Sequence, residues 1–128
     1  MKAQWIYVPM RPFGKARPRV TSNGTFMPAS YTKAKDNLKM MYGAVDEFEY
    51  IRLDVIAVRK IPKNGRSGGV KVAPGDYCTV KPDLDNIIGA VMDALFPESD
   101  SQVVELGICR KIWGDDDAIC IRVIEVTQ

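Results

Sequence analysis

The chain has 128 residues, of which 46% are hydrophobic, so it is long enough for one core and too apolar for a disordered segment. It contains no histidine, which excludes His general bases, Ser-His-Asp triads and imidazole-ligated metals. No apolar run is long enough to cross a bilayer, and the N-terminal segment lacks the long apolar stretch of a secretory signal. We therefore expect a cytoplasmic protein with no membrane partner.

Charge is distributed unevenly along the sequence, although the net value is only +2. Residues 1–71 carry 14 Lys and Arg against 5 Asp and Glu, a net +9, whereas residues 72–128 carry 4 against 11, a net −7. A basic half next to an acidic half favours a surface for a polyanion beside one for a cation. Charges that interleave after folding explain the same numbers, so both interpretations stay open.

The first half of the chain predicts a strand at 4–9, a loop or hairpin over 11–29 with a turn at Asn23 and Gly24, a helix over 30–45 and a strand at 50–60. In the helix, Ser30 or Thr32 is expected to act as the N-cap. Leu38, Met41 and Tyr42 are expected to form its apolar face.

The strand at 50–60 alternates well, with Leu53 and Val55 pointing one way and Arg52 and Asp54 the other. After it the sequence predicts a mobile polar loop over 61–77, a helix between Pro82 and Pro97, and two strands at 103–113 and 118–126 joined by residues 114–117. The helix carries one apolar stripe, formed by Leu84, Ile87, Ile88, Val91, Met92 and Leu95.

These elements predict an α+β fold in a single domain over residues 1–128. We expect two helices and a mixed, largely antiparallel sheet that ends in a C-terminal hairpin. The three cysteines, Cys78, Cys109 and Cys120, lack the spacing of a zinc site or a disulfide framework, so they are interpreted as small core residues.

The segment KPDLDN, residues 81–86, brings two carboxylates to the start of the second helix. If the backbone stays extended as far as Asp85, then Asp83 and Asp85 point to the same side. Two adjacent carboxylates repel each other unless a cation lies between them, and hard oxygen ligands suit Mg²⁺ or Mn²⁺. Capping and the helix dipole would fully explain one Asp, but two Asp with Asn86 exceed what a cap requires.

Asp100 is a third acidic candidate, between the helix and the strand that begins near Val103. Helix rise alone places the start of this segment about 15 Å from Asp85. Residues 96–102 are long enough to run back beside the helix, so a shared site is permitted without being required. The alternative is an ordinary turn Asp.

Two motifs together resemble one family. The resemblance is carried by KPDLDNIIGAVMDAL followed by SDSQVVEL, and upstream by KARPRVT and FMPASYTKAK. The chain is similar to the RusA family of Holliday junction resolvases over about residues 8–126. The resemblance implies a Mg²⁺-dependent endonuclease, with Mn²⁺ as a substitute, in which Asp83, Asp85 and Asp100 are the catalytic metal ligands. It also implies a homodimer that resolves four-way DNA junctions by paired symmetric phosphodiester hydrolysis in recombination or repair, and a phage or prophage origin.

Basic residues near the N-terminus are candidates for DNA contacts. Lys15, Arg17 and Arg19 would bind backbone phosphates, which supply affinity without sequence readout. Lys71 in the polar loop and Lys81 before the acidic pair are further candidates. The alternative is that the arginines only make a loop soluble.

The sequence departs from the family at Gly89, four residues after Asp85, where the family usually has a lysine that could reach the scissile phosphate. Lys81 or Lys71 could supply the missing charge. Two other readings therefore remain: a branched-DNA-binding protein of the same fold with weak or no nuclease activity, and an unrelated module in which the Asp residues are caps and turns.

Overall fold

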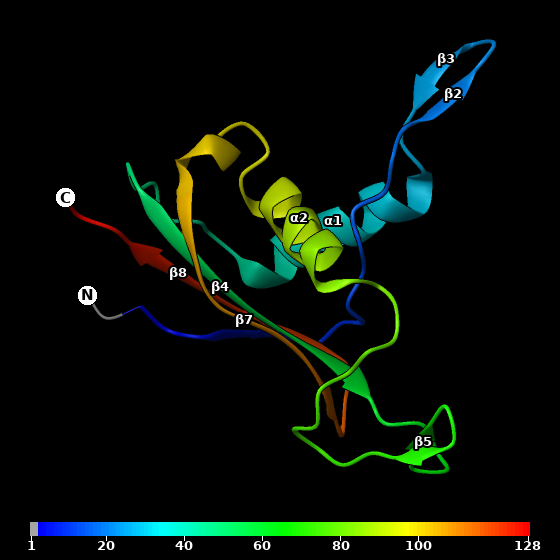
Figure 1. Cartoon of the computed structure of the whole chain (residues 1–128). Coiled ribbons are helices and arrows are strands. Elements are labelled where there is room, and N and C mark those ends of the chain that lie inside the picture. Colours follow the sequence, from blue (N-terminus) through cyan, green and yellow to red (C-terminus); the bar gives the residue numbers. More distant parts are fainter. Residues whose placement is uncertain (1–2) are drawn as a thin grey trace.

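The computed structural model describes residues 3–128 and consists of a four-stranded sheet with two helices on one face (Figure 1). In chain order the elements are β1 (Ile6–Val8), β2 (Arg19–Thr21), β3 (Gly24–Phe26), α1 (Ala29–Tyr42), β4 (Ile51–Lys60), β5 (Arg66–Ser67), β6 (Val70–Lys71), α2 (Leu84–Leu95), the 3₁₀ helix η1 (Asp100–Gln102), β7 (Val103–Gly114) and β8 (Ala118–Glu125). The predicted α+β class is confirmed. No helix within residues 3–128 is long and apolar enough to span a membrane.

The main sheet has the strand order β1-β8-β4-β7. Its β1–β8 and β8–β4 pairings are antiparallel and its β4–β7 pairing is parallel, so the sheet is mixed and largely antiparallel, as predicted. The predicted direct pairing of the last two strands is wrong, because β4 lies between β7 and β8. The connection crosses the end of β4, where Lys60 N donates to Asp117 Oδ1 at 2.8 Å and Ile61 N donates to Gly114 O at 2.9 Å. The arrangement gives the buried strand β4 a hydrogen-bonded neighbour on both edges.

Helix α2 follows its predicted apolar stripe. Ile87, Ile88, Val91 and Leu95 are buried, and Leu84 is half-buried against the same core. Prolines stand just outside both ends of the helix, as the sequence indicates. The stripe fixes which face of α2 points away from the core, and the acidic residues lie on that other face.

Helix α1 differs from its prediction at both ends. It begins at Ala29 with Pro28 in the N-cap position and no side-chain cap, so the expected caps Ser30 and Thr32 lie inside the helix. It ends at Tyr42, and the next residue, Gly43, has a φ of 92°, in the left-handed region that favours glycine at a helix end. Leu38 is buried as expected, but Met41 is 43% exposed and Tyr31 is buried instead, through the contact with α2 described below.

Two small hairpins project from the body of the molecule (Figure 1). The first pairs β2 with β3 around the turn that the sequence predicts, and the second pairs β5 with β6 inside the segment 61–77, which was expected to lack strands. Both hairpins are mostly exposed and carry basic residues. They are therefore surface projections and do not belong to the core.

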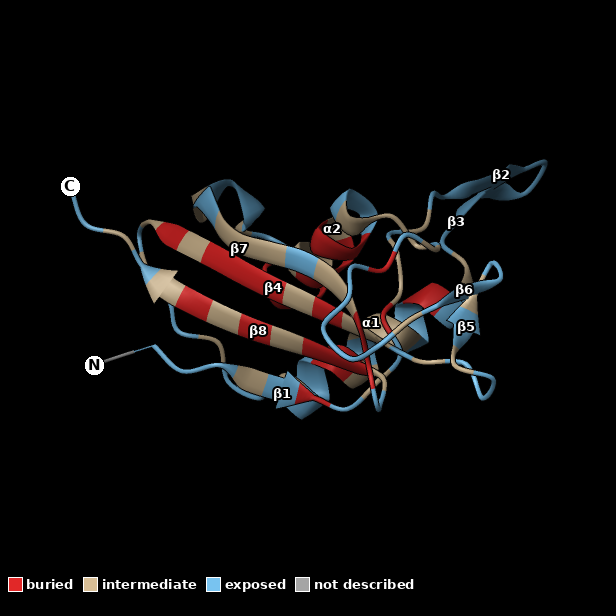
Figure 2. Ribbon diagram, turned by 60° about the horizontal axis from the view of Figure 1, so that its bottom comes forward, coloured by how far each residue is buried: buried red, intermediate tan, exposed pale blue. Residues whose placement is uncertain are grey.

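The core lies between the sheet and the two helices. Buried residues alternate along β4 and β8, as Figure 2 shows, and include Leu53, Val55, Ile119 and Ile121. The three cysteines are free thiols that are buried or half-buried, and burial raises the pKa of Cys109 and Cys120. Asp54 is the one charged side chain that is fully buried among residues 3–128.

Candidate active site

The two aspartates of the KPDLDN segment lie at the start of α2. The helix begins at Leu84, so Asp83 is the last extended residue, at the N-cap, and Asp85 lies in the first helical turn. The extended backbone that the sequence argument assumed as far as Asp85 therefore ends two residues earlier. Asp83 is half-exposed and Asp85 is exposed, so solvent reaches both carboxylates.

Neither carboxylate acts as a helix cap. Asp83 occupies the N-cap position, yet within the described chain its side chain makes no capping hydrogen bond; it accepts one from Lys81 Nζ at 2.9 Å. That hydrogen bond and the charges of Lys81 and Lys111 lower the pKa of Asp83. Across residues 3–128, the Asp85 carboxylate has no ion pair or side-chain hydrogen bond. Capping thus fails to explain the acidic pair.

The backbone just before the acidic pair is held by two cations from the sheet. Lys111 Nζ, on β7, donates to Val80 O at 2.7 Å and to Pro82 O at 2.9 Å. The guanidinium of Arg59, on β4, donates to Lys81 O between them. Three successive carbonyls are therefore bound by side chains of the sheet, which fixes where Asp83 leaves the loop. Sequence reasoning missed both cations; the only signal was a lysine within the apolar strand that became β7.

The basic segment before β2 packs against the same part of α2. Lys15 N donates to Asn86 O at 2.9 Å. A Cβ added to Gly14 would lie 3.1 Å from Pro82 Cβ and 3.3 Å from Asn86 Cβ, so the approach is close. In Figure 1 this segment, between β1 and β2, passes beside the beginning of α2. These contacts place Lys15 beside the acidic pair, whereas the sequence had indicated only that Lys15 binds DNA phosphates.

Farther along α2, Asp93 ties the two helices together. Its carboxylate accepts hydrogen bonds from Tyr31 Oη at 2.9 Å and from Lys35 Nζ at 3.1 Å. Burial alone would raise the pKa of Asp93, but these hydrogen bonds and the charges of Lys35 and Lys15 leave it below its usual range. Desolvation and Asp93 together raise the pKa of Tyr31. Lys35 therefore helps to hold α1 against α2.

Asp100 is exposed and begins η1, after the C-terminal end of α2. Among residues 3–128, no three His, Cys, Asp or Glu side chains gather closely enough to hold a metal ion. The structure therefore brings Asp83 and Asp85 to one helix start but does not assemble them with Asp100 as a ready-made cluster. The oxygen-only donors of the pair still suit Mg²⁺, which keeps several waters and needs few protein ligands.

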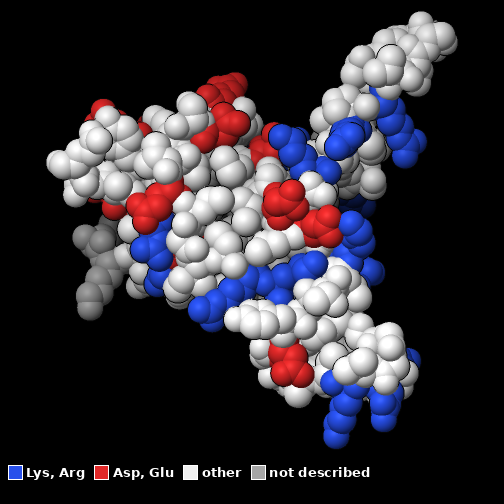
Figure 3. Space-filling view, in the orientation of Figure 1, with Lys and Arg blue, Asp and Glu red and all other residues white. Residues whose placement is uncertain are grey.

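Basic side chains surround the acidic pair on this face of the molecule. Figure 3 shows Lys and Arg gathered toward the two hairpins, with acidic side chains at the opposite end and a few between the basic groups. Arg17 is exposed, Arg19 begins β2 and Lys71 ends β6. Arg59 also lines an open hollow of about 300 Å³, whose other basic residues are Arg11, Lys60 and Lys63.

An α+β domain whose exposed carboxylates do not cap their helix and lie between basic surfaces has the features of a metal-dependent nuclease. The family model of the endodeoxyribonuclease RusA matches residues 9–124, so the chain belongs to the RusA endodeoxyribonuclease family. Proteins of this family are metal-dependent crossover junction resolvases with a branched DNA substrate. A search of curated proteins found no match to the chain.

Proposed function

We propose that the protein is a Mg²⁺-dependent endonuclease that resolves four-way DNA junctions by paired symmetric nicks, with Mn²⁺ as a substitute. The observation that carries the proposal is the exposed pair Asp83 and Asp85, neither of which caps α2, on a backbone segment bound by Arg59 and Lys111. Their oxygens remain available for a ligand, and the segment that presents them is anchored.

In this proposal Asp83 and Asp85 hold the metal and Asp100 is the third ligand. The ion pair between Asp83 and Lys81 is exposed, with the Lys81 side chain 84% accessible, so giving it up to a divalent cation would cost little free energy. The Asp100 carboxylate has no ion pair within residues 3–128 and is free to approach a bound cation. When bound, Mg²⁺ lowers the pKa of a water molecule and offsets negative charge on the phosphate.

The DNA lies, in this proposal, across the basic surface that joins the two hairpins. Lys15, Arg17 and Arg19 contact backbone phosphates on one side of the site, and Lys71 does so on the other. Lys81 would add one further phosphate contact if Asp83 bound a metal in its place. The hollow beside Arg59 supports this path, because it continues the basic surface directly from the anchored segment.

A homodimer completes the proposal, because a four-way junction has two strands that must be cut symmetrically and a two-fold dimer matches that symmetry. The edges of the main sheet are β1 and β7. Residues 75–78 already bind the backbone of β7 at residues 111–113, so β1 and the first part of β7 are the edges that could pair with a second copy. The proposed assembly therefore carries one active site for each strand.

A second candidate function is binding of branched DNA without cleavage. The observation that favours it is Gly89, which leaves α2 without a cation one turn after Asp85. In that case the same basic surface would hold the junction, and the acidic pair would bind metal without a hydrolytic step.

Cleavage of a labelled four-way junction, compared with linear duplex, tests both candidates. We expect paired nicks only with Mg²⁺ or Mn²⁺, and a loss of at least about 10²-fold in Asp85→Asn, because the variant removes a charged metal ligand. Asp36→Asn is the matched control, since Asp36 is exposed on α1. Tight junction binding without cleavage by the unmodified protein would favour the binding-only function. Full activity in Asp85→Asn would refute the proposed metal site.

A further inference from the structure

A glycine lies in the middle of α2, on the face that the core does not use. Glycine inside a helix is less favourable than alanine, so its presence here needs a reason. Among the described residues, leaving aside the helix's own backbone and the two chain neighbours, a Cβ at this position would meet only Lys15, whose Cδ and Cβ would lie 3.4 and 3.7 Å away. The space that a side chain would take on α2 is thus occupied by the Lys15 stem.

Lys15 is fixed at this position by its backbone. Its N–H donates to Asn86 O at 2.9 Å, and Gly14 before it approaches Pro82 and Asn86 too closely for a larger residue to fit without a shift. The stem therefore crosses α2 at a defined point, while the residue itself stays exposed and its ammonium group reaches solvent.

The crossing point lies between two carboxylates. Asp85, Gly89 and Asp93 are spaced four residues apart and share one face of α2, where such neighbours have Cβ atoms about 5–6 Å apart. Asp93 already has two partners, Tyr31 and Lys35, whereas Asp85 has none within residues 3–128. Within residues 3–128 the Lys15 ammonium makes no hydrogen bond to Asp93, although its charge helps to lower the Asp93 pKa. Its stem lies over Gly89, one turn from Asp85, so the exposed ammonium can turn toward either carboxylate.

We propose that Lys15, seated over Gly89, is the cation that contacts the scissile phosphate beside Asp83 and Asp85. This rests on the proposed nuclease function and assigns one catalytic role within it. The charge of Lys15 stabilises the negative charge that grows on the phosphate oxygens during hydrolysis, and its docked stem reduces the cost of placing it there. The Lys81 side chain is 84% accessible and Lys71 lies on the exposed β5–β6 hairpin, so neither stem is held against α2 in this way.

The first test compares Lys15→Met, which keeps the stem and removes the charge, with Lys39→Met, which removes an exposed charge on α1. In single-turnover cleavage of a four-way junction with Mg²⁺ at saturating protein, we expect Lys15→Met to lower the rate by about 10²-fold, whereas the junction Kd rises only a few-fold from the loss of one phosphate contact. Lys39→Met is expected to leave both the single-turnover rate and the junction Kd unchanged, because this lysine lies on α1 outside the proposed DNA path. Cleavage by Lys15→Met at the unmodified rate would overturn the inference.

The second test moves the charge onto the helix. With Lys15→Ala the space over Gly89 opens, so a lysine at position 89 fits where the stem used to lie. We expect the double variant Lys15→Ala and Gly89→Lys to cut at least tenfold faster than Lys15→Ala alone, because a cation is restored one turn from Asp85 (about 1.4 kcal/mol of transition-state stabilisation). A double variant no faster than Lys15→Ala would contradict the proposed position of the charge.

A third measurement needs no DNA and no metal. Because Lys15 is among the charges that lower the pKa of Asp93, Lys15→Met is expected to raise that pKa in an NMR titration, whereas Arg17→Met leaves it unchanged. An unchanged Asp93 pKa in Lys15→Met would show that Lys15 does not lie along α2. Failure of the proposed function looks different, since the unmodified protein would then bind junctions and cut none.

Discussion

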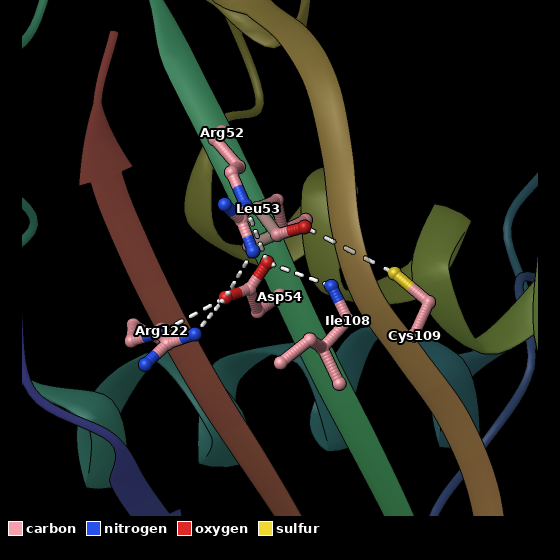
Figure 4. Close-up of polar contacts among 6 residues, drawn as sticks. All are labelled: Arg52, Leu53, Asp54, Ile108, Cys109 and Arg122. Atoms are coloured by element: carbon pink, nitrogen blue, oxygen red, sulfur yellow. Dashed lines mark hydrogen bonds and ion pairs between the residues drawn. The ribbon is translucent and has the colours of Figure 1, made fainter.

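Two aspartate sites on opposite sides of the main sheet show how differently the same side chain is used. Asp54 is fully buried, and its carboxylate accepts from Arg52 Nε at 3.0 Å, Ile108 N at 3.0 Å and Arg122 at 2.6 Å (Figure 4). Asp83, at the start of α2, is half-exposed and has one exposed partner. A carboxylate whose oxygens are bound by its own chain holds the fold together, whereas one with free oxygens is available to a ligand.

The Asp54 site depends on an irregularity in the sheet. The β4–β7 register shifts after Leu53, so that Asp54 faces two residues, Gly107 and Ile108, and the freed Ile108 N–H turns to its carboxylate. A Cβ at Gly107 would collide with the side chains of Arg52 and Asp54, which explains the glycine. The strand β7 is thus shaped around a buried charge that no ligand reaches.

The largest expected effect on stability comes from breaking the buried site. Asp54→Asn leaves two arginines without their counter-charge, and we expect a loss of about 3 kcal/mol in the free energy of unfolding, with a decrease of roughly 10 °C in Tm. Urea unfolding and thermal melts measure both quantities. Junction cleavage per folded molecule should stay within about twofold of the unmodified protein, because Asp54 lies away from α2.

Asp36→Asn serves again as the control, since an exposed helical Asp is expected to change stability by less than about 0.5 kcal/mol. If Asp54→Asn lost cleavage activity while remaining as stable as this control, the distinction between a structural and a ligand-binding aspartate would be wrong.

Sequence patterns identified the two sites unequally. The apolar stripe of α2 and the alternation of β4 are local signals, so the elements and the exposed acidic pair were predictable, and the family motif marked Asp83 and Asp85. The burial of Asp54 was not predictable. Alternation placed its side chain on the face of the sheet opposite Leu53, and only the bulge in β7, with the arginines beside it, shields the carboxylate from solvent. Residues 114–117 could connect β7 and β8 either as a hairpin turn or across the end of β4, so the strand order could not be predicted from this segment alone.

Arg59 and Lys111 were missed for a similar reason, and Lys15 was predicted only as a DNA contact and not as a neighbour of α2. Arg59 and Lys111 bind carbonyls 22 and 29 residues away in sequence, and Lys15 crosses α2 from a segment more than 60 residues earlier. No periodicity within one element encodes such contacts. They become visible only when β4, β7 and the N-terminal segment meet at the start of α2.

The next prediction concerns the anchor of the exposed site. Lys111→Met keeps the stem but no longer binds Val80 O and Pro82 O, so the segment before Asp83 loses its fixed position. We expect a decrease of about tenfold in cleavage rate together with a higher half-saturating Mg²⁺ concentration, as is typical when groups that orient metal ligands are removed.

Arg110→Met, on the adjacent exposed position of β7, is the matched control and should leave the metal requirement unchanged. A Lys111→Met variant with a normal Mg²⁺ dependence but lower thermal stability would show that Lys111 supports the fold and does not position Asp83.

The smallest effect sharpens the comparison at Asp93, a carboxylate on the same face of α2 as Asp85 but with two partners of its own. Its pKa is lowered in the folded protein, so its contribution to stability is present above the pKa of the unfolded chain and is lost as pH falls through the folded value. Asp93→Asn should therefore lower the free energy of unfolding by about 1 kcal/mol near neutral pH, measured by urea unfolding, and this loss should shrink below about pH 4.

Asp85→Asn, which removes no such partner, should change the free energy of unfolding by less than about 0.5 kcal/mol at either pH while abolishing cleavage. An equal loss of stability in the two variants would mean that Asp85 is held by the fold as Asp93 is, and its oxygens would then not be free for a metal.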